Sequence, residues 1–189
     1  TRVQGLLNAS CGSPDKPTFN AGYGPDFTSM SQMITTAFSC DLARVATLQL
    51  GLVPAEDLGY PGENVHDGFA HGQHNDPMAA QAMTEYSALH AAQMAELLTM
   101  LDSIPEGNGT MLDNTLVVWT SELGDGAHGF EHLPVVMAGG QGFKLGQYVH
   151  YPSDTPFEGW WWDGTKLPSL GRPHQKLLTS IAQAFDLRD

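Results

Sequence analysis

The sequence is poor in basic residues. It contains 8 Lys and Arg against 21 Asp and Glu in 189 residues, which gives a formal net charge of −13. Such a chain repels phosphate backbones and anionic headgroups, so we expect no nucleic acid partner and no electrostatic docking to membranes. The sequence also lacks any apolar run of the ~18–20 residues that a membrane span needs, so no membrane span is expected.

Cysteine is scarce as well, since Cys11 and Cys40 are the only two. They fit one disulfide in an exported protein, and they fit two separate thiols equally well. The chain opens at Thr1 without a basic or long apolar leader, which predicts that any targeting peptide has been removed. The sequence has no GxxxxGK[ST] and no GxGxxG between a strand and a helix, so no organic cofactor is expected, and it has no GxSxG nucleophile motif.

Hydrophobic residues make up 41% of the chain, enough for one core. Turn-forming residues dominate positions 1–26, which predicts an irregular lead-in before a single α/β domain over 27–189. The apolar spacing predicts helices after Asp26, over about 77–103 and over 173–187. A segment rich in Val, Thr and Leu predicts a strand at 44–50, and apolar runs predict strands at 115–119 and 133–138, with 115–119 typical of a buried parallel strand.

Two polar loops carry histidines and carboxylates. The first loop, 51–76, contains Asp67 and His71, and the second contains Glu122, His128 and His132. Loops at the carboxyl ends of strands meet at one edge of an open α/β sheet, so we expect these side chains to lie together. Imidazole and carboxylate ligands suit zinc, iron or manganese, which makes this a candidate site for a divalent metal. The alternative is two ordinary solvated loops, because a loop histidine is more often solvated than a ligand.

The segment GTMLDNTLVVWTSELGDGAHGFEHLPVVMAGGQGFKLGQYVHYP, with SCDLARVATLQL upstream and HQKLLTSIAQAFDL downstream, resembles the exported bacterial proteins of the DUF1552 (HXXSHH-motif) family. The resemblance covers most of residues 38–187 and extends to the related DUF1501 proteins. These families are similar to distant members of the alkaline phosphatase and sulfatase superfamily. The resemblance implies an alkaline-phosphatase-like α/β/α sandwich, of which this chain is the C-terminal portion. It also implies a two-metal site whose ligands are Asp67, His71, Glu122 and either His128 or His132.

The chain departs from the family pattern in two places. Its histidine motif, His66 to His71, lacks the serine and the histidine doublet of H-x-x-S-H-H, and residues 1–26 show no strand that carries a nucleophile. We therefore expect an exported, periplasmic or extracellular, non-catalytic structural or interaction subunit. Its irregular 141–172 segment, with Trp160–Trp162, would pack against a protein partner or the remainder of the same polypeptide. The alternative is a metal-dependent hydrolase of phosphate or sulfate esters with its nucleophile in a preceding segment.

Overall fold

The structure is a computed structural model of the chain. It describes residues 16, 19–124, 128, 133–151, 158–160, 166–168 and 172–187. The chain divides into two compact units. The first comprises Thr1–Trp119 with Val136–Leu145, and the second comprises Thr120–Val135 with Gly146–Asp189.

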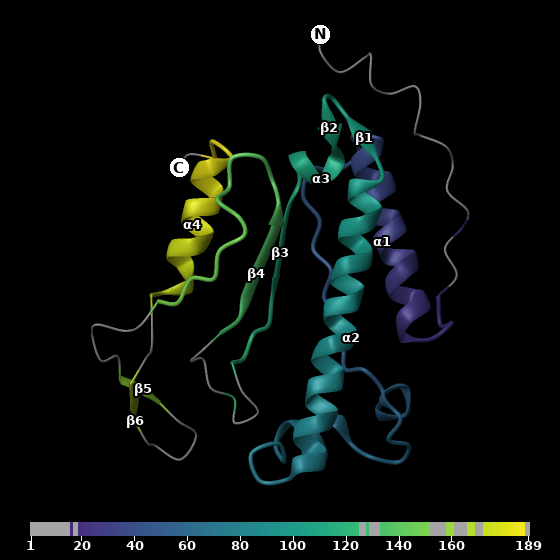
Figure 1. The fold of residues 1–189 in the computed structure, drawn as a ribbon, viewed down its shortest axis with the longest axis vertical. Coiled ribbons are helices and arrows are strands. Elements are labelled where there is room, and N and C mark those ends of the chain that lie inside the picture. The colour runs from purple at the N-terminus through teal and green to yellow at the C-terminus, as the bar shows by residue number, and fades with distance from the viewer. Residues whose placement is uncertain are drawn as a thin grey trace. The chain divides into compact units, whose positions relative to one another are not determined.

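Two long helices of the first unit, α1 (Tyr23–Ser39) and α2 (Pro77–Asp102), lie side by side (Figure 1). Both helices were predicted from their apolar spacing. Helix α2 begins as expected, because the Asp76 carboxylate accepts a hydrogen bond from the Met78 N–H at 2.9 Å and Pro77 needs no partner at the first helical position. Helix α1 begins earlier than expected, at Tyr23, within the predicted lead-in.

Polar contacts join α1 to α2. The Thr28 hydroxyl donates to the Glu96 carboxylate at 2.7 Å, and the Tyr23 hydroxyl lies 2.9 Å from Nε2 of His90. Nδ1 of His90 lies 2.9 Å from the Tyr86 carbonyl oxygen, and the ring is buried. His90 is therefore a packed mid-helix histidine that contacts Tyr23 of α1. Burial, with a smaller electrostatic contribution from Tyr86, raises the pKa of Tyr23 to about 12.

A small core fixes the connection between the two helices. Residues 51–76 contain two short turns, η1 (Ala55–Leu58) and η2 (Val65–Ala70), whose apolar side chains pack on α2. The buried residues of this core are Ala55, Val65, Phe69, Ala79 and Ala82. Phe69 is only 1% exposed and meets the Tyr60 ring edge-on, with 5.1 Å between the ring centroids. The connection is therefore an ordered part of the first unit.

The prediction of a buried parallel strand at 115–119 is wrong. Strand β3 (Leu116–Thr120) pairs with β4 (Val135–Gly139), and no residue of either strand is buried. The two strands are antiparallel, because Thr120 at the end of β3 hydrogen-bonds to Pro134 and the end of β4 at Gly139 lies against Thr115. A return loop therefore joins these strands where a parallel pair would need a crossover.

The predicted strand at 44–50 has no strand partner among the described residues. After α2 the chain forms a small hairpin, β1 (Pro105–Glu106) with β2 (Gly109–Thr110), followed by the short helix α3 (Met111–Asn114). The first unit thus combines helices with small sheets. This composition agrees with an α/β chain in general.

The described part of the second unit contains helix α4 (His174–Ala184), within the range predicted at 173–187. Strand β5 (Glu158–Trp160) pairs antiparallel with β6 (Lys166–Pro168), inside a segment that was predicted to be mostly irregular. Trp161 and Trp162 lie outside the described residues. No helix in the described part of the chain is long and apolar enough to cross a membrane.

Candidate functional site

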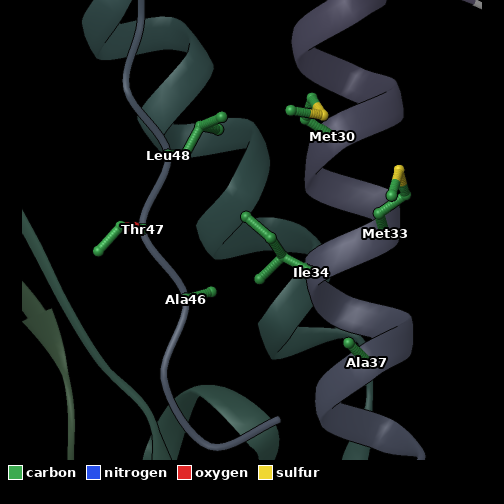
Figure 2. A pocket seen from close by; sticks show the side chains of 7 residues that line it. All are labelled: Met30, Met33, Ile34, Ala37, Ala46, Thr47 and Leu48. Carbon is green, nitrogen blue, oxygen red and sulfur yellow. The ribbon is translucent and has the colours of Figure 1, made fainter. Parts of the chain in front are cut away.

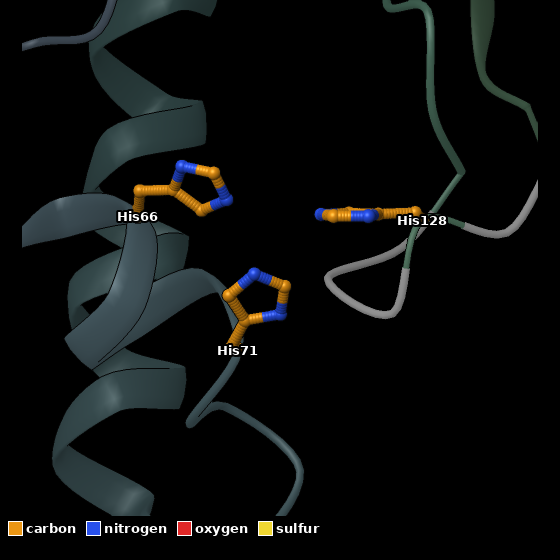
Figure 3. A group of neighbouring side chains, drawn as sticks. All are labelled: His66, His71 and His128. Atoms are coloured by element: carbon orange, nitrogen blue, oxygen red, sulfur yellow. The ribbon is translucent and has the colours of Figure 1, made fainter. Parts of the chain in front are cut away.

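The candidate site lies on η2, which is a π-helical turn. In such a turn an N–H bonds to the carbonyl oxygen five residues earlier, and here the His71 N–H donates to the His66 carbonyl at 3.2 Å. The wide turn brings these two histidines to one side, where their rings stack with centroids 4.9 Å apart and planes 25° apart. Figure 3 shows the two rings projecting from the turn. Both side chains are exposed.

Asn64 holds the start of this turn. Its side-chain oxygen accepts hydrogen bonds from the His66 N–H at 2.9 Å and from the Asp67 N–H at 3.0 Å. Its side-chain amide donates to the Asp67 carboxylate at 3.1 Å. One side chain therefore satisfies two N–H groups at the start of the turn and positions the neighbouring carboxylate.

Packing fixes the other side of the turn. Val65 and Phe69 point into the core while His66 and His71 remain exposed. The chain bends closely after His71, where a Cβ atom at Gly72 would overlap the Gly68 carbonyl oxygen. Glycine at position 72 therefore lets the backbone pass this point.

The structure places the predicted ligands as follows. His71 lies beside His66, whereas the Asp67 carboxylate is engaged by Asn64. Glu122 and His128 belong to the second unit, where both are exposed. His128, which is also drawn in Figure 3, has a left-handed backbone with φ of 65°. His132 lies outside the described residues.

Sequence reasoning missed His66 as a partner of His71. Residues five apart point in different directions on an α-helix, so their spacing carries no signal for a shared site. The π-helical turn changes that angle, and nothing local in the sequence marks a turn of this width. The only cue is Asn64, which is a favoured capping residue directly before the turn.

The histidine pair offers nitrogen ligands for a borderline metal ion. The ring nitrogens of His66 and His71 come within 4.8 Å of each other. Two histidine nitrogens bound to one zinc ion are roughly 3.3 Å apart, given zinc–nitrogen distances of about 2.0–2.1 Å in a tetrahedron. Small side-chain rotations would close this difference. The pair would supply two of the four ligands of such an ion.

Comparisons with known proteins add no relative. No known protein family matches the chain, and no curated protein or solved structure matches it either. Any function must therefore be argued from the residues themselves.

Proposed function

We propose that this chain is a non-catalytic interaction subunit of an exported, DUF1552-like protein. The observation that carries this proposal is a group of exposed apolar side chains in the first unit. Leu42 is 79% exposed, Val45 80% and Leu52 62%, all within eleven residues of sequence. Single exposed apolar residues are common on soluble proteins, but a group of them is typical of a surface that another polypeptide covers.

The exposed strands support the same proposal. Residues 115–119 read as a continuous apolar run, which is typical of a strand covered on both faces. In the described chain, Val118 of β3 is 37% exposed and Val136 of β4 is 44% exposed. A layered α/β/α sandwich completed by further polypeptide would cover these faces. This is why we favour an alkaline-phosphatase-like assembly.

The cysteines support an exported location. Cys40 is disulfide-bonded, and Cys11 is the only other cysteine in the chain. Disulfides persist in the periplasm and outside the cell, whereas the cytosol keeps thiols reduced. We therefore propose a periplasmic or extracellular protein.

Site-specific photo-crosslinking in cells that export the protein tests the interaction role. A photoreactive residue at Leu42 should give covalent adducts with a polypeptide. The same residue at Ala88, which is exposed on α2, serves as the matched control. If the Leu42 position gives no adducts above the Ala88 level, the exposed group is ordinary surface and the proposal is wrong.

The second candidate function is a metal-dependent hydrolase of phosphate or sulfate esters, and the His66–His71 pair favours it. Both side chains would hold the ion, and Asn64 would fix the turn that carries them. A bound divalent ion would stabilise developing negative charge and activate a nucleophile. It would also supply a local positive charge that attracts an anionic substrate to a chain whose net charge is −13.

Metal analysis tests this second candidate. Purified protein loaded with zinc, iron or manganese should retain stoichiometric metal and lose it in His71→Ala and His66→Ala. His74→Ala is the matched control, because His74 is an exposed histidine of the same loop. Wild-type protein that retains no metal, or His74→Ala protein that loses as much as His71→Ala, contradicts the site. Aryl phosphates and aryl sulfates then test for turnover in the loaded protein.

A further inference from the structure

Residues Val45–Leu50 form an extended segment that runs beside α1. Ala46 and Leu48 point toward this helix, whereas Thr47 points away (Figure 2). The segment and the helix enclose an apolar groove of about 240 Å³, lined by Met30, Met33, Ile34, Ala37, Ala46, Thr47 and Leu48. The segment therefore has one face over a helix and one open face, which is the arrangement of a strand in a sheet covered on one side.

The backbone of this segment is unpaired. Within the described residues, no backbone N–H or carbonyl group from Val45 to Leu50 takes part in a hydrogen bond. The nearest contacts are at its two ends, where the Ala43 N–H bonds to Ala37 and the Gly51 carbonyl accepts from Tyr23. Six unpaired residues of this kind are a template for another strand.

We propose that this segment pairs antiparallel with the same segment of a second copy of the chain. The proposal rests on the interaction role proposed above and names its partner. A two-fold axis perpendicular to the sheet relates the two strands, so the same face of each strand lies on the same side of the sheet. Residues that lie directly opposite each other must then belong to the same face, which requires that one residue pairs with its own copy at the axis. With Leu48 at the axis, apolar residues pair with apolar residues and polar residues pair with polar residues. Leu48 meets its own copy and Ala46 meets Leu50 on the helix side, while Thr47 meets Gln49 on the open side.

Charge also favours a second copy at this position. Two chains of net charge −13 repel each other over most of their surfaces. No charged residue occurs from Val45 to Val53, and the nearest charge, Arg44, is paired with Asp41. In the proposed register Arg44 lies opposite Leu52, so no like charges face each other. The segment is therefore a place where two copies can meet without like charges in direct contact.

Cysteine cross-linking tests the register. The described chain has no free cysteine, so a disulfide between two chains would form through the introduced thiol. Opposite residues in an antiparallel pair have Cα atoms about 4.5–5.5 Å apart, within the range of a disulfide. Leu48→Cys should therefore give a disulfide-linked dimer under mild oxidation. Val45→Cys should not, because two copies of residue 45 would be offset by six residues, roughly 20 Å along the strands.

Charge substitutions on the open face test the pairing while Ala46 and Leu48, which point toward α1, stay unchanged. Thr47 and Gln49 are both exposed. Sedimentation should show wild-type mass shifting from 20.4 kDa to twice that value as concentration rises. The double variant Thr47→Lys with Gln49→Lys places lysines opposite lysines and should lose the dimer, whereas Thr47→Lys with Gln49→Glu places opposite charges together and should retain it.

Three results would overturn the proposal. The first is a wild-type chain that keeps its native helical signal but stays at 20.4 kDa at every concentration. The second is equal cross-linking of Leu48→Cys and Val45→Cys. The third is an equal mass for the lysine–lysine and lysine–glutamate double variants. A monomeric chain whose Leu42 position still forms adducts with a different polypeptide would overturn the second copy and leave the interaction role standing. A monomeric chain without such adducts would contradict both.

Discussion

Replacing Asn64 with alanine tests how the histidine pair is held. The change removes the acceptor for the His66 and Asp67 N–H groups and the donor to the Asp67 carboxylate. Asn64 is exposed, so no cavity forms and the loss is confined to these hydrogen bonds. Loss of a capping side chain costs about 1 kcal/mol. We expect the turn to open about fivefold more often, since 1.4 kcal/mol corresponds to tenfold.

Amide hydrogen exchange measured by NMR checks this expectation. The amides of His66 and Asp67 should exchange about fivefold faster in Asn64→Ala, while amides in the middle of α2 keep their native rates. Nuclear Overhauser contacts between the His66 and His71 rings should weaken at the same time. If the wild-type chain binds zinc at the His66–His71 pair, the zinc affinity of Asn64→Ala should fall by a similar factor.

Asn64→Ser is the matched control. Serine is a favoured capping residue whose hydroxyl oxygen accepts from an N–H group at the start of a turn, but it lacks the amide that donates to Asp67 and adds no charge beside it. Exchange at His66 and Asp67 should therefore stay closer to the wild-type rate than in Asn64→Ala. If Asn64→Ala leaves both exchange rates unchanged, or if Asn64→Ser accelerates them as much as alanine does, the side chain does not hold the turn and the reasoning fails.

Four further substitutions probe the first unit, each measured by denaturant or thermal unfolding. Phe69→Ala should lower the free energy of unfolding by about 3–5 kcal/mol, because the side chain is 1% exposed at the centre of the core; a loss below about 1 kcal/mol would contradict that position. Burial raises the pKa of Tyr23 to about 12 in the folded chain against an ordinary value of 10.0, so wild-type stability should fall as the pH rises from 10 to 12, and Tyr23→Phe should make that slope shallower; an unchanged slope would contradict this. Gln93→Met should raise stability by about 1 kcal/mol, because both polar side-chain atoms of Gln93 are buried without a hydrogen bond among the described residues; a loss would reveal a partner. Gly139→Ala should destabilise the β3–β4 pair, since position 139 has φ of 72° and a Cβ there would overlap the Thr115 carbonyl; an unchanged midpoint would contradict this.

The helices could be predicted from the sequence because their signals are local. Apolar residues at three- and four-residue spacings marked α1, α2 and α4, and Asp76 with Pro77 marked the first turn of α2. Strand partners are chosen by residues distant in the sequence, so apolar content alone could not identify them. The apolar run at 115–119 is typical of a strand buried on both faces, but in the described chain no residue of β3 is buried and residues 44–50 have no strand partner.

The candidate site could be predicted only in part. The histidine-rich loop and His71 were found from residue type, but the expected partner Asp67 is held by Asn64, and His66 takes the place beside His71. His66 lies beside His71 because of the π-helical turn, which depends on an Asn64 cap and on burial of Phe69 against α2. Such a combination of a local cap and a distant packing contact has no single sequence signature.

The two proposed activities of the first unit can be separated by experiment. The pairing segment, Val45–Leu50, has no histidine or carboxylate, and the metal-binding candidates His66 and His71 take no part in the proposed strand pairing. Substitutions at independent sites without shared partners are nearly additive. Thr47→Lys with Gln49→Lys should therefore abolish self-association without changing zinc affinity, and His71→Ala should do the reverse. If one substitution changed both properties, metal binding and assembly would be coupled, and the strand pairing could not act independently of the η2 turn.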